Sequence, residues 1–324
     1  MTITKTPLTD LQSLPGLQQV ESRLQEMSRG ADLWTPQFSS TVTSGGKRLR
    51  PALVLLCGSF KASSQQQLID VATAVELIHT ASLVHDDIID RAAYRRGRPT
   101  ISATKGNRQA VLYGDFLFAR AFTLLTKHGL HEILRYMTQA ISLMCEGEIG
   151  QANQLFNCQL QEKDYFAYIY KKTAYFLAAC CRAGAEASGI PQAQKDALEA
   201  FGLYLGYAFQ LSDDLLDFLG DSKVTGKPIL QDLHEGYLTL PLIKLLKDPL
   251  YGLRTRHIIE ERDFTDANIA FICSSLHKSG IIAEVKEKTR ELIAQAKQNL
   301  EVVAPKPART VLARLADYIV QRAY

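Results

Sequence analysis

The sequence predicts an all-α protein, and three observations lead to this fold class. Apolar residues recur at steps of three and four along most of the chain, which is the spacing of one helix face. Convincing runs of alternating apolar and polar residues, typical of strands, are absent from the pattern. Glycine and proline number only 20 and 11 among 324 residues, which argues against a sandwich or barrel with many tight turns.

The helical spacing predicts helices that follow one another with turn signals between them. They cover residues 46–60, 65–90, 107–127, 131–152, 165–187, 192–218, 240–247, 266–279, 281–300 and 308–323. Gly- and Pro-containing clusters at 96–99, 188–191, 226–228 and 305–307 separate several of them. No Gly/Ser-rich linker divides the chain, so we expect one domain over residues 1–324, with an N-terminal helical segment in residues 1–44.

The composition excludes several classes of function. Lys plus Arg is 37 and Asp plus Glu is 34, and a net charge of +3 is too balanced for generic binding to nucleic acid. No run of about 18 apolar residues exists, so we expect no transmembrane segment, and residues 1–16 have no apolar signal core. The scattered cysteines, which form no Cys-x-x-Cys pattern, are expected to be reduced core thiols of a cytoplasmic protein. They are Cys57, Cys145, Cys158, Cys180, Cys181 and Cys273.

One short acidic pattern occurs twice, each time at the end of a long apolar helical stretch. The copies are Asp86-Asp87-Ile88-Ile89-Asp90 and Asp213-Asp214-Leu215-Leu216-Asp217. In a helix, the first and last aspartates of each copy are four residues apart and project from one face. Like charges at that spacing repel one another, and nearby apolar surface raises the cost of the charges further. The pattern therefore predicts bound cations.

Two other interpretations of the aspartates remain open at this point. A solvated helix face explains a single acidic cluster, and glycoside hydrolysis uses two carboxyl groups. Six carboxyl groups in two copies with identical spacing better match a multinuclear metal site. Oxygen ligands suit a hard ion such as Mg²⁺, which usually takes one or two carboxylates together with substrate phosphates. The expected metal site consists of Asp86, Asp87, Asp90, Asp213, Asp214 and Asp217.

Basic clusters alternate with the acidic ones along the chain. The segment 45–51 reads Gly-Gly-Lys-Arg-Leu-Arg-Pro and opens a helix, whose N-terminal amides favour an anion. Arg95 and Arg96 follow the first acidic cluster, Lys172 lies in a helix rich in aromatic residues, and Lys227 follows the second cluster. An exposed surface explains each of these cations singly. Their alternation with acidic clusters is what a diphosphate held by Mg²⁺ and by Arg or Lys requires.

From residue 45 to its end, the chain resembles the trans-isoprenyl diphosphate synthases. The resemblance rests on the segment 45–51, the segment 79–87, Arg95-Arg96-Gly97, Lys172-Thr173 and the segment 209–214. The Asp-Asp-x-x-Asp element alone is degenerate, but two copies in this order with these companions are highly specific. Residues 1–44 resemble the family only loosely.

The resemblance implies the isoprenoid synthase fold, which is a single helical bundle around a deep central apolar cavity. It implies head-to-tail trans condensation of isopentenyl diphosphate with an allylic diphosphate, with three Mg²⁺ ions. By position, Asp86, Asp90 and Asp213 would bind Mg²⁺ directly, and the other three aspartates would act through water or hydrogen bonds. The cavity would have to be dry, because water would trap the allylic cation.

The resemblance also implies roles for residues outside the acidic clusters. Those expected to bind isopentenyl diphosphate are Lys47, Arg50, His79 and Arg96. Those expected to hold the allylic diphosphate are Arg95, Lys172 and Lys227. Thr173 and Gln210 would line the developing carbocation, so the expected catalytic residues are Lys172, Thr173 and Gln210. Taken alone, His79 would fit an ordinary core histidine, and His85 is expected to be structural.

Residues one turn before the first acidic cluster predict the length of the product. Ala81 and Ser82 lie five and four residues before Asp86. In the family, a bulky aromatic residue at either position closes the cavity and gives short products. Both residues are small here, so we expect a long-chain product, hexaprenyl or longer, of the kind used for quinone side chains. The alternative is that the small residues only permit close packing of helices.

The chain departs from the family pattern after the second acidic cluster. Leu230 stands where a second glycine is common, and Tyr237 stands where a lysine is common. We expect altered affinity for diphosphate rather than lost chemistry, since both acidic clusters are intact. The segments 165–185 and 316–322 resemble the catalytic subunit (component II) of heteromeric heptaprenyl diphosphate synthases. The expected assembly is therefore a homodimer or a heteromer with a small regulatory subunit, with a peripheral membrane contact for product release.

Three functions from different classes stay open on the sequence alone. The first is the prenyl-elongating transferase, either long-chain or a shorter farnesyl or geranylgeranyl synthase. The second is a terpene cyclase, which shares the bundle but lacks the isopentenyl site, so Lys47, Arg50 and Arg96 argue against it. The third is a non-catalytic regulatory subunit, which usually loses acidic residues that are all present here.

Overall fold

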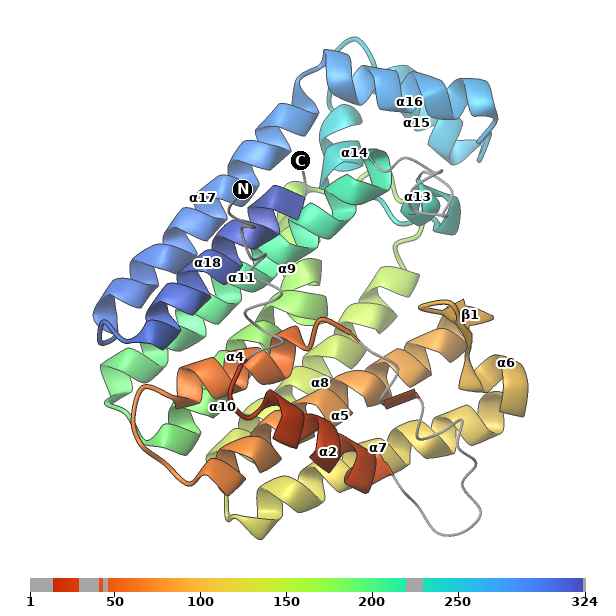
Figure 1. The fold of residues 1–324 in the computed structure, drawn as a ribbon. Helices are drawn as coiled ribbons and strands as arrows, with labels where there is room; N and C mark the ends of the chain where they lie inside the picture. The colour runs from red at the N-terminus through yellow and green to blue at the C-terminus, as the bar shows by residue number, and fades with distance from the viewer. Residues whose placement is uncertain (1–13, 29–40, 43–45, 220–229, 323–324) are drawn as a thin grey trace, which may run out of the picture. The chain divides into compact units, whose positions relative to one another are not determined.

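The protein was analysed as a computed structural model that describes residues 14–28, 41–42, 46–219 and 230–322 (Figure 1). Nearly all regular structure in these residues is helical, which confirms the all-α fold class. The helices are α2 (Leu17–Ser28), α4 (Leu49–Gly58), α5 (Gln65–Ile89), α6 (Ile101–Lys105), α7 (Asn107–Lys127), α8 (His131–Ala152), α9 (Glu162–Ile169), α10 (Tyr175–Ser188), α11 (Gln192–Leu219), α13 (Gln231–Glu235), α14 (Leu240–Leu245), α15 (Gly252–Glu260), α16 (Asp266–Lys278), α17 (Ile281–Asn299) and α18 (Pro307–Arg322).

The remaining regular elements are short. A π-helical turn, η1 (Tyr170–Ala174), separates α9 from α10, and a 3₁₀ turn, η2 (Leu300–Val302), follows α17. Strands β1 (Tyr94–Arg95) and β2 (Arg98–Pro99) pair antiparallel in a small hairpin after α5. The predicted helical segment 165–187 is therefore helical throughout, but η1 divides it into two α-helices. Helices α2, α6, α13 and α15 were not predicted individually.

The chain divides into two compact units. Unit 1 comprises residues 1–141, 179–199 and 301–312, and unit 2 comprises residues 142–178, 200–300 and 313–324. Helices α8, α10, α11 and α18 contribute residues to both units. The expectation of a single domain over residues 1–324 stays a prediction.

In unit 1 the long helix α5 is the centre of packing. It contacts α2, α4 and α7, and Figure 1 shows α5 and α7 running side by side. Ser64 caps its first turn by accepting a hydrogen bond from the Gln67 amide, and its interior contains no glycine or proline. Leu77 and Ile78 of α5 and Tyr113 of α7 are fully buried. Helix α5 thus places its last turn, which holds the first acidic cluster, on a rigid support.

The length and apolar composition of α5 have to be compared with the expectation that no segment spans a membrane. Among the described residues it is the one helix that is long and apolar enough to do so by length and composition, which corrects the sequence expectation that no helix qualifies. Most of its apolar stretch is buried in contact with α2, α4 and α7. A buried core helix of a globular protein passes the same test.

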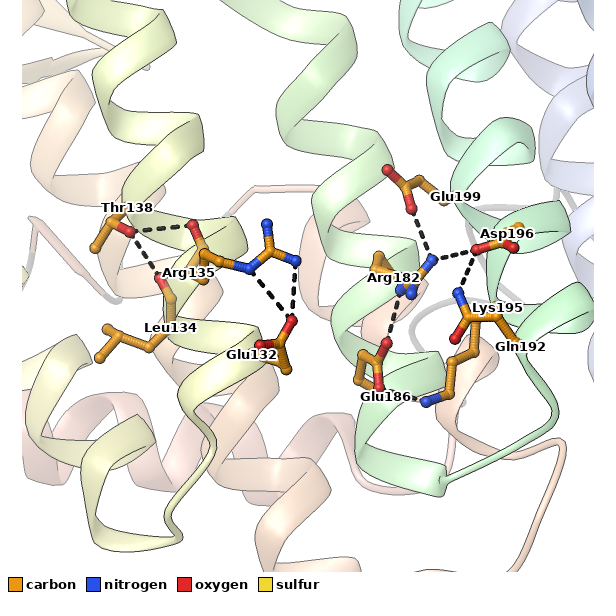
Figure 2. Close-up of polar contacts among 10 residues, drawn as sticks. All are labelled: Glu132, Leu134, Arg135, Thr138, Arg182, Glu186, Gln192, Lys195, Asp196 and Glu199. Carbon is orange, nitrogen blue, oxygen red and sulfur yellow. Dashed lines mark hydrogen bonds and ion pairs between the residues drawn. The ribbon is translucent and has the colours of Figure 1, made fainter.

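A buried arginine fixes the turn between α10 and α11 in unit 1. Arg182 donates to Glu186 at 2.8 Å, to Asp196 at 2.6 Å and to Glu199 at 2.9 Å (Figure 2). Lys195 also contacts Glu186, so two cations balance three carboxylates. A buried guanidinium is stable only when its donors are satisfied, so this network ties the end of α10 to the start of α11.

Unit 2 contains the second acidic cluster, at the end of α11. Helix α14 contacts α9, α16 and α17, and α16 contacts α17. Phe201, Leu205, Leu242 and Val285 are among its fully buried side chains. Helix α9 begins with a capping box, in which the side chains of Gln161 and Asp164 bond each other's backbone amides.

The cysteine prediction is only partly correct. All six thiols are free, and Cys57, Cys158, Cys180 and Cys181 are buried, as expected for core thiols. Cys145 is exposed because it lies on the outer face of α8, and Cys273 is half-buried. A scattered cysteine has no local signal that distinguishes the inner from the outer face of a helix.

A glycine crossing between α4 and α10 generates a first prediction. A Cβ atom on Gly184 would overlap the Val54 carbonyl oxygen and lie 3.0 Å from the Gly58 amide nitrogen. We expect Gly184→Ala to lower the free energy of unfolding by about 1–3 kcal/mol, because backbone atoms cannot yield as a side chain would. Urea denaturation measures the change.

Gly150→Ala is the matched control for Gly184→Ala. Gly150 is also helical, but nothing lies within 4 Å of an added Cβ there. Alanine should raise stability at that position by about 0.5–1 kcal/mol, since it restricts the unfolded chain. Equal effects of the two substitutions would contradict the close approach of α4 and α10.

Candidate functional site

The first acidic cluster occupies the carbonyl end of α5. Asp86 is half-buried, Asp87 is buried and Asp90 is the exposed cap of the helix. The Asp87 carboxylate accepts a hydrogen bond from Arg95 Nε at 2.6 Å. The β1–β2 hairpin brings Arg95 back toward α5 after only a few residues. Burial raises the pKa of Asp87, and the Arg95 guanidinium opposes that rise.

The second acidic cluster occupies the corresponding end of α11. Asp214 is buried, Asp213 and Asp217 are half-buried, and the helix ends two residues later at Leu219. The Asp217 carboxylate accepts the backbone amides of Gln231 at 3.0 Å and Asp232 at 3.2 Å. These amides belong to the first turn of α13, so Asp217 anchors that helix to the end of α11.

The position of both clusters at helix C-termini explains why they are costly. The last carbonyl groups of a helix point away from it and give that end a partial negative charge. Three aspartates at such an end add to this charge instead of balancing it. A cation is the natural compensation, and carboxylate and carbonyl oxygens are the ligands that Mg²⁺ prefers.

A chain of hydrogen bonds links the second cluster to two predicted catalytic residues in unit 2. Thr173 Oγ1 donates to Gln210 Oε1 at 2.6 Å, and Gln210 Nε2 donates to Asp214 Oδ1 at 2.8 Å. Tyr165 OH donates to the other oxygen, Asp214 Oδ2, at 2.5 Å. Burial raises the pKa of Asp214 to about 7, while the bonds from Tyr165 and Gln210 hold it lower than burial alone would. Both oxygens of Asp214 are therefore used inside the protein.

Lys172, the third predicted catalytic residue, lies on the π-helical turn η1. Its ammonium contacts Glu148 Oε1 at 3.0 Å and Gln151 Oε1 at 3.5 Å. It also lies over the rings of Tyr168 at 5.4 Å and Tyr237 at 5.9 Å, within the range of cation–π attraction. Single π-helical turns insert one residue and are frequent at functional sites.

A pocket of about 210 Å³ adjoins these residues in unit 2. Its lining includes Gln151, Tyr165, Tyr168, Lys171 and Tyr237. Tyr237, at the position where the family often has a lysine, therefore contributes an aromatic wall and a partner for Lys172. The replacement of the common lysine by Tyr237 thus changes both the pocket lining and the surroundings of Lys172.

Leu230, the other departure, has a strained backbone. It precedes α13 with φ 61° and ψ 39°, a left-handed conformation that glycine adopts without cost. Its side chain is fully buried, and its amide donates to the Asp217 carbonyl at 3.1 Å. Burial of the leucine side chain offsets the strain that glycine would avoid.

Predicted cations converge on a small pocket of about 50 Å³ in unit 1. Its lining includes His79, Arg95 and Arg96. Arg50 Nη1 lies 3.0 Å from His79 Nε2, and because arginine can only donate, the histidine nitrogen accepts. Burial, and then Arg50 and Arg96, lower the pKa of His79 well below its ordinary value, so the ring is neutral.

The loop of residues 46–48 before α4, here called the Gly-rich loop, lies close to Arg96. A Cβ atom on Gly46 would lie 2.7 Å from Arg96 Nη1, so this glycine lets the Arg96 guanidinium approach the loop backbone. Lys47 is exposed on that loop. Lys227 lies outside the described residues. The structure thus gathers His79, Arg95 and Arg96 around one pocket and places Arg50 in contact with His79.

Sequence reasoning missed several residues that contact predicted site residues. They are Glu148, Gln151, Tyr165 and Tyr168. Tyr165 and Tyr168 lie seven and four residues before Lys172, so helical spacing was an available signal for them. His85, expected to be structural, donates from Nε2 to the Val111 carbonyl oxygen at 3.2 Å and packs against Gly114 of α7.

No group of three or more His, Cys, Asp or Glu side chains within the described ranges is arranged to hold a metal ion. The donor set is a separate observation: each acidic cluster supplies carboxylates, and Mg²⁺ usually completes its shell with water and substrate phosphates. The residues present therefore suit a metal that binds together with a phosphorylated substrate.

Asp214 generates a second prediction, on the pH dependence of stability. An acid whose pKa is higher in the folded protein than its unfolded value binds its proton more tightly when folded. The free energy of unfolding should therefore fall between about pH 4 and about pH 7, with a slope of about 1.4 kcal/mol per pH unit from this one group. Urea denaturation of the metal-free protein across this range measures the slope.

Two variants isolate the contribution of Asp214. In Asp214→Asn, the free energy of unfolding should no longer show the part of the pH slope that this carboxyl contributes. Tyr165→Phe removes a hydrogen bond that lowers the pKa of Asp214, so the fall in stability should extend to higher pH. Parallel curves for the wild-type protein and Asp214→Asn would show that the carboxyl titrates normally.

Comparison with known proteins agrees with this chemistry. The family model described as polyprenyl synthetase matches residues 33–276. The chain is 37% identical to heptaprenyl diphosphate synthase component 2 of Geobacillus stearothermophilus over 87% of each protein. It is 32% identical to octaprenyl diphosphate synthase of Escherichia coli, again over 87% of each.

Two solved structures are similar over nearly the whole chain. A decaprenyl diphosphate synthase from Rhodobacter capsulatus has a TM-score of 0.91 and 32% identity, covering 98% of this chain and 99% of that one. A polyprenyl synthase from Caulobacter crescentus, complexed with calcium and isoprenyl diphosphate, has a TM-score of 0.88 and 31% identity, with 98% of both chains covered. The chain therefore belongs to the polyprenyl synthetase family, and it is a trans-polyprenyl diphosphate synthase, a prenyltransferase.

Proposed function

We propose that the protein elongates an allylic diphosphate with isopentenyl diphosphate to a product of hexaprenyl length or longer, for quinone side chains. The observation that supports this most directly is the presence of an acidic cluster at the carbonyl end of α5, paired with Arg95, and of a second one at the carbonyl end of α11, bonded to Gln210. The names of similar proteins, heptaprenyl, octaprenyl and decaprenyl diphosphate synthases, support a long product.

Two roles are proposed for the six aspartates. Asp86, Asp90 and Asp213 are proposed as direct ligands of three Mg²⁺ ions. Asp87 holds Arg95, Asp214 is held by Tyr165 and Gln210, and Asp217 holds α13. When bound, Mg²⁺ would offset the charge that develops on the departing diphosphate.

The cations divide between the two substrates. Lys47, Arg50, His79 and Arg96 are proposed for isopentenyl diphosphate, and Arg95, Lys172 and Lys227 for the allylic diphosphate. The neutral state of His79 suits hydrogen bonding, while the guanidinium groups supply the positive charge. The oxygen atoms of Thr173 and Gln210, joined by a hydrogen bond, are proposed to stabilise the positive charge on the allylic carbon.

The direct test is an assay of the purified protein with labelled isopentenyl diphosphate, farnesyl diphosphate and Mg²⁺. Chromatography of the extracted products should show chains of hexaprenyl length or longer. Asp86→Ala and Asp213→Ala should each reduce the rate by at least about 100-fold, since the diphosphate loses charge stabilisation. Products of only farnesyl or geranylgeranyl length would overturn the long-chain proposal.

A third prediction concerns product length. Ala81 is fully buried and Ser82 half-buried on α5, one turn before the first acidic cluster, and Ile78 lies buried a turn further back. Ser82→Phe should shorten the product because its ring would fill the space that the growing chain occupies. Chromatography of the products measures the change.

Ser82→Ala is the matched control for Ser82→Phe. It removes the hydroxyl that donates to the His79 carbonyl at 2.9 Å but adds no volume. It should leave the product length unchanged. A shorter product from Ser82→Ala as well would show that the hydrogen bond, and not the volume, controls length.

The assembly is proposed as a homodimer or as a heteromer with a small regulatory subunit. Val111 and Leu112 are exposed apolar residues on α7, and contiguous exposed apolar surface is typical of interfaces. The names of two similar proteins as component 2 of heptaprenyl diphosphate synthase support a partner. We further propose a cytoplasmic location with peripheral membrane contact for release of the apolar product.

The assay of the purified protein also separates the two assemblies. A homodimer should be active alone. A heteromer should be inactive alone and regain activity when cell extract from its own source is added, with a second polypeptide co-purifying with the activity.

A further inference from the structure

Arg48 lies between two proposed ligands of isopentenyl diphosphate but points elsewhere. Lys47 is exposed and Arg50 is half-buried against His79, whereas Arg48 is 7% exposed. The backbone of Arg48 is left-handed, with φ 47° and ψ 36°. This conformation turns the backbone just before α4. The Arg48 guanidinium contacts Glu21 and Glu76, whereas that of Arg50 contacts His79.

The Arg48 guanidinium is almost fully used by protein groups. Nε and Nη2 donate to the two carboxylate oxygens of Glu21 at 2.5 and 3.0 Å. Nη1 donates to Glu76 at 2.7 Å, and Nη2 also donates to the Val42 carbonyl at 2.9 Å. A guanidinium has five N–H donors, so four are engaged, and Arg48 is unsuited to binding a diphosphate itself.

The partners of Arg48 connect the Gly-rich loop to two helices. Glu21 lies on α2, and Glu76 lies on α5 one turn before His79. Arg48, Glu76 and His79 line the same pocket as Arg96. Without a cation beside it, the Glu76 carboxylate would repel an anionic ligand from this pocket. The Arg48 guanidinium therefore both fixes the loop and neutralises Glu76.

Helix α2 is attached to α5 at a second place that does not touch the loop. Arg23 Nε donates to Asp70 Oδ1 at 2.9 Å, and His128 lies 2.7 Å from the other oxygen of Asp70. Leu17, Val20 and Leu24 of α2 are buried. Two ion pairs therefore join α2 to other described elements, and of these only that of Glu21 reaches Arg48.

We propose that Arg48 is a positioning residue for the isopentenyl diphosphate site, and that helix α2 takes part in this site through Glu21. This inference rests on the function proposed above. Arg48 does not touch the substrate. It holds the Gly-rich loop so that Lys47 and Arg50 face the ligand, and it keeps Glu76 from repelling it.

The test compares Glu21→Gln with the wild-type enzyme in steady-state kinetics and in calorimetric titration with isopentenyl diphosphate. Loss of the ionic pair should raise the KM and Kd for isopentenyl diphosphate by about fivefold or more. The KM for farnesyl diphosphate and kcat should change less than about twofold, since the allylic site is not involved. Arg48→Lys should act in the same direction, because an ammonium group cannot bridge three partners.

Arg23→Gln is the matched control, since it breaks the other ion pair of α2. It should lower the melting temperature but leave the KM for isopentenyl diphosphate unchanged. The proposal is overturned if Glu21→Gln and Arg23→Gln raise this KM alike, if Glu21→Gln raises the KM of both substrates equally, or if it changes neither. The first result would mean that the affinity for isopentenyl diphosphate depends on the packing of α2 as a whole and not on Arg48.

Hydrogen exchange separates failure of this inference from failure of the proposed function. If the wild-type protein binds no isopentenyl diphosphate, the proposed function fails. The positioning role is then judged from amide exchange of residues 46–51. Faster exchange in Glu21→Gln than in Arg23→Gln supports the role of Arg48 in ordering the loop, and equal exchange overturns it.

Discussion

Carboxylates concentrated at the carbonyl ends of two long helices are the constraint on which the rest of the site depends. The ends of α5 and α11 are already negative because their last carbonyl groups have no partners within the helix. Three aspartates at each end add charge of the same sign beside apolar core. Such an arrangement is stable only if the surroundings supply hydrogen-bond donors or cations, and most contacts of these residues do so.

The compensation differs between the two clusters. Asp87 receives a guanidinium, because the short β1–β2 hairpin returns Arg95 to α5. Asp214 receives only neutral donors, from Tyr165 and Gln210, and its pKa is raised to about 7. Asp217 receives two backbone amides of α13. Arg95 thus contributes a positive charge to the first cluster, while Tyr165 and Gln210 contribute neutral hydrogen-bond donors to the second, and Gln210 also bonds to Thr173.

The departures from the family pattern are accommodated by the same physical means. Where the family often has a lysine, Tyr237 places an aromatic ring beside Lys172. The ring attracts the Lys172 ammonium, whereas a second lysine would repel it. The backbone of Leu230 is left-handed, which is unfavourable for leucine, and the full burial of its side chain offsets this cost. All six carboxylates of the acidic clusters are present, which agrees with a family member that retains its chemistry.

The sequence by itself determined the fold class, the long helices and the residue types of the site. The bounds of α7 and α8 agree with the predicted ranges. About twenty residues of regular apolar spacing leave few alternative positions for the two ends of a helix. Five-residue helices such as α6 and α13 contain too few turns to show a period. The π-helical turn η1 was also missed, since one inserted residue barely alters the spacing of apolar positions.

Only the tertiary structure decided which of several similar residues does what. Arg48 and Arg50 are equivalent in the sequence, yet one is buried between Glu21 and Glu76 and the other contacts His79. Tyr165 became part of the site only because α9 lies against the end of α11. The physical reason is that a side chain's role depends on backbone direction and on partners distant in the chain, and neither the left-handed turn at Arg48 nor these partners can be read from local spacing.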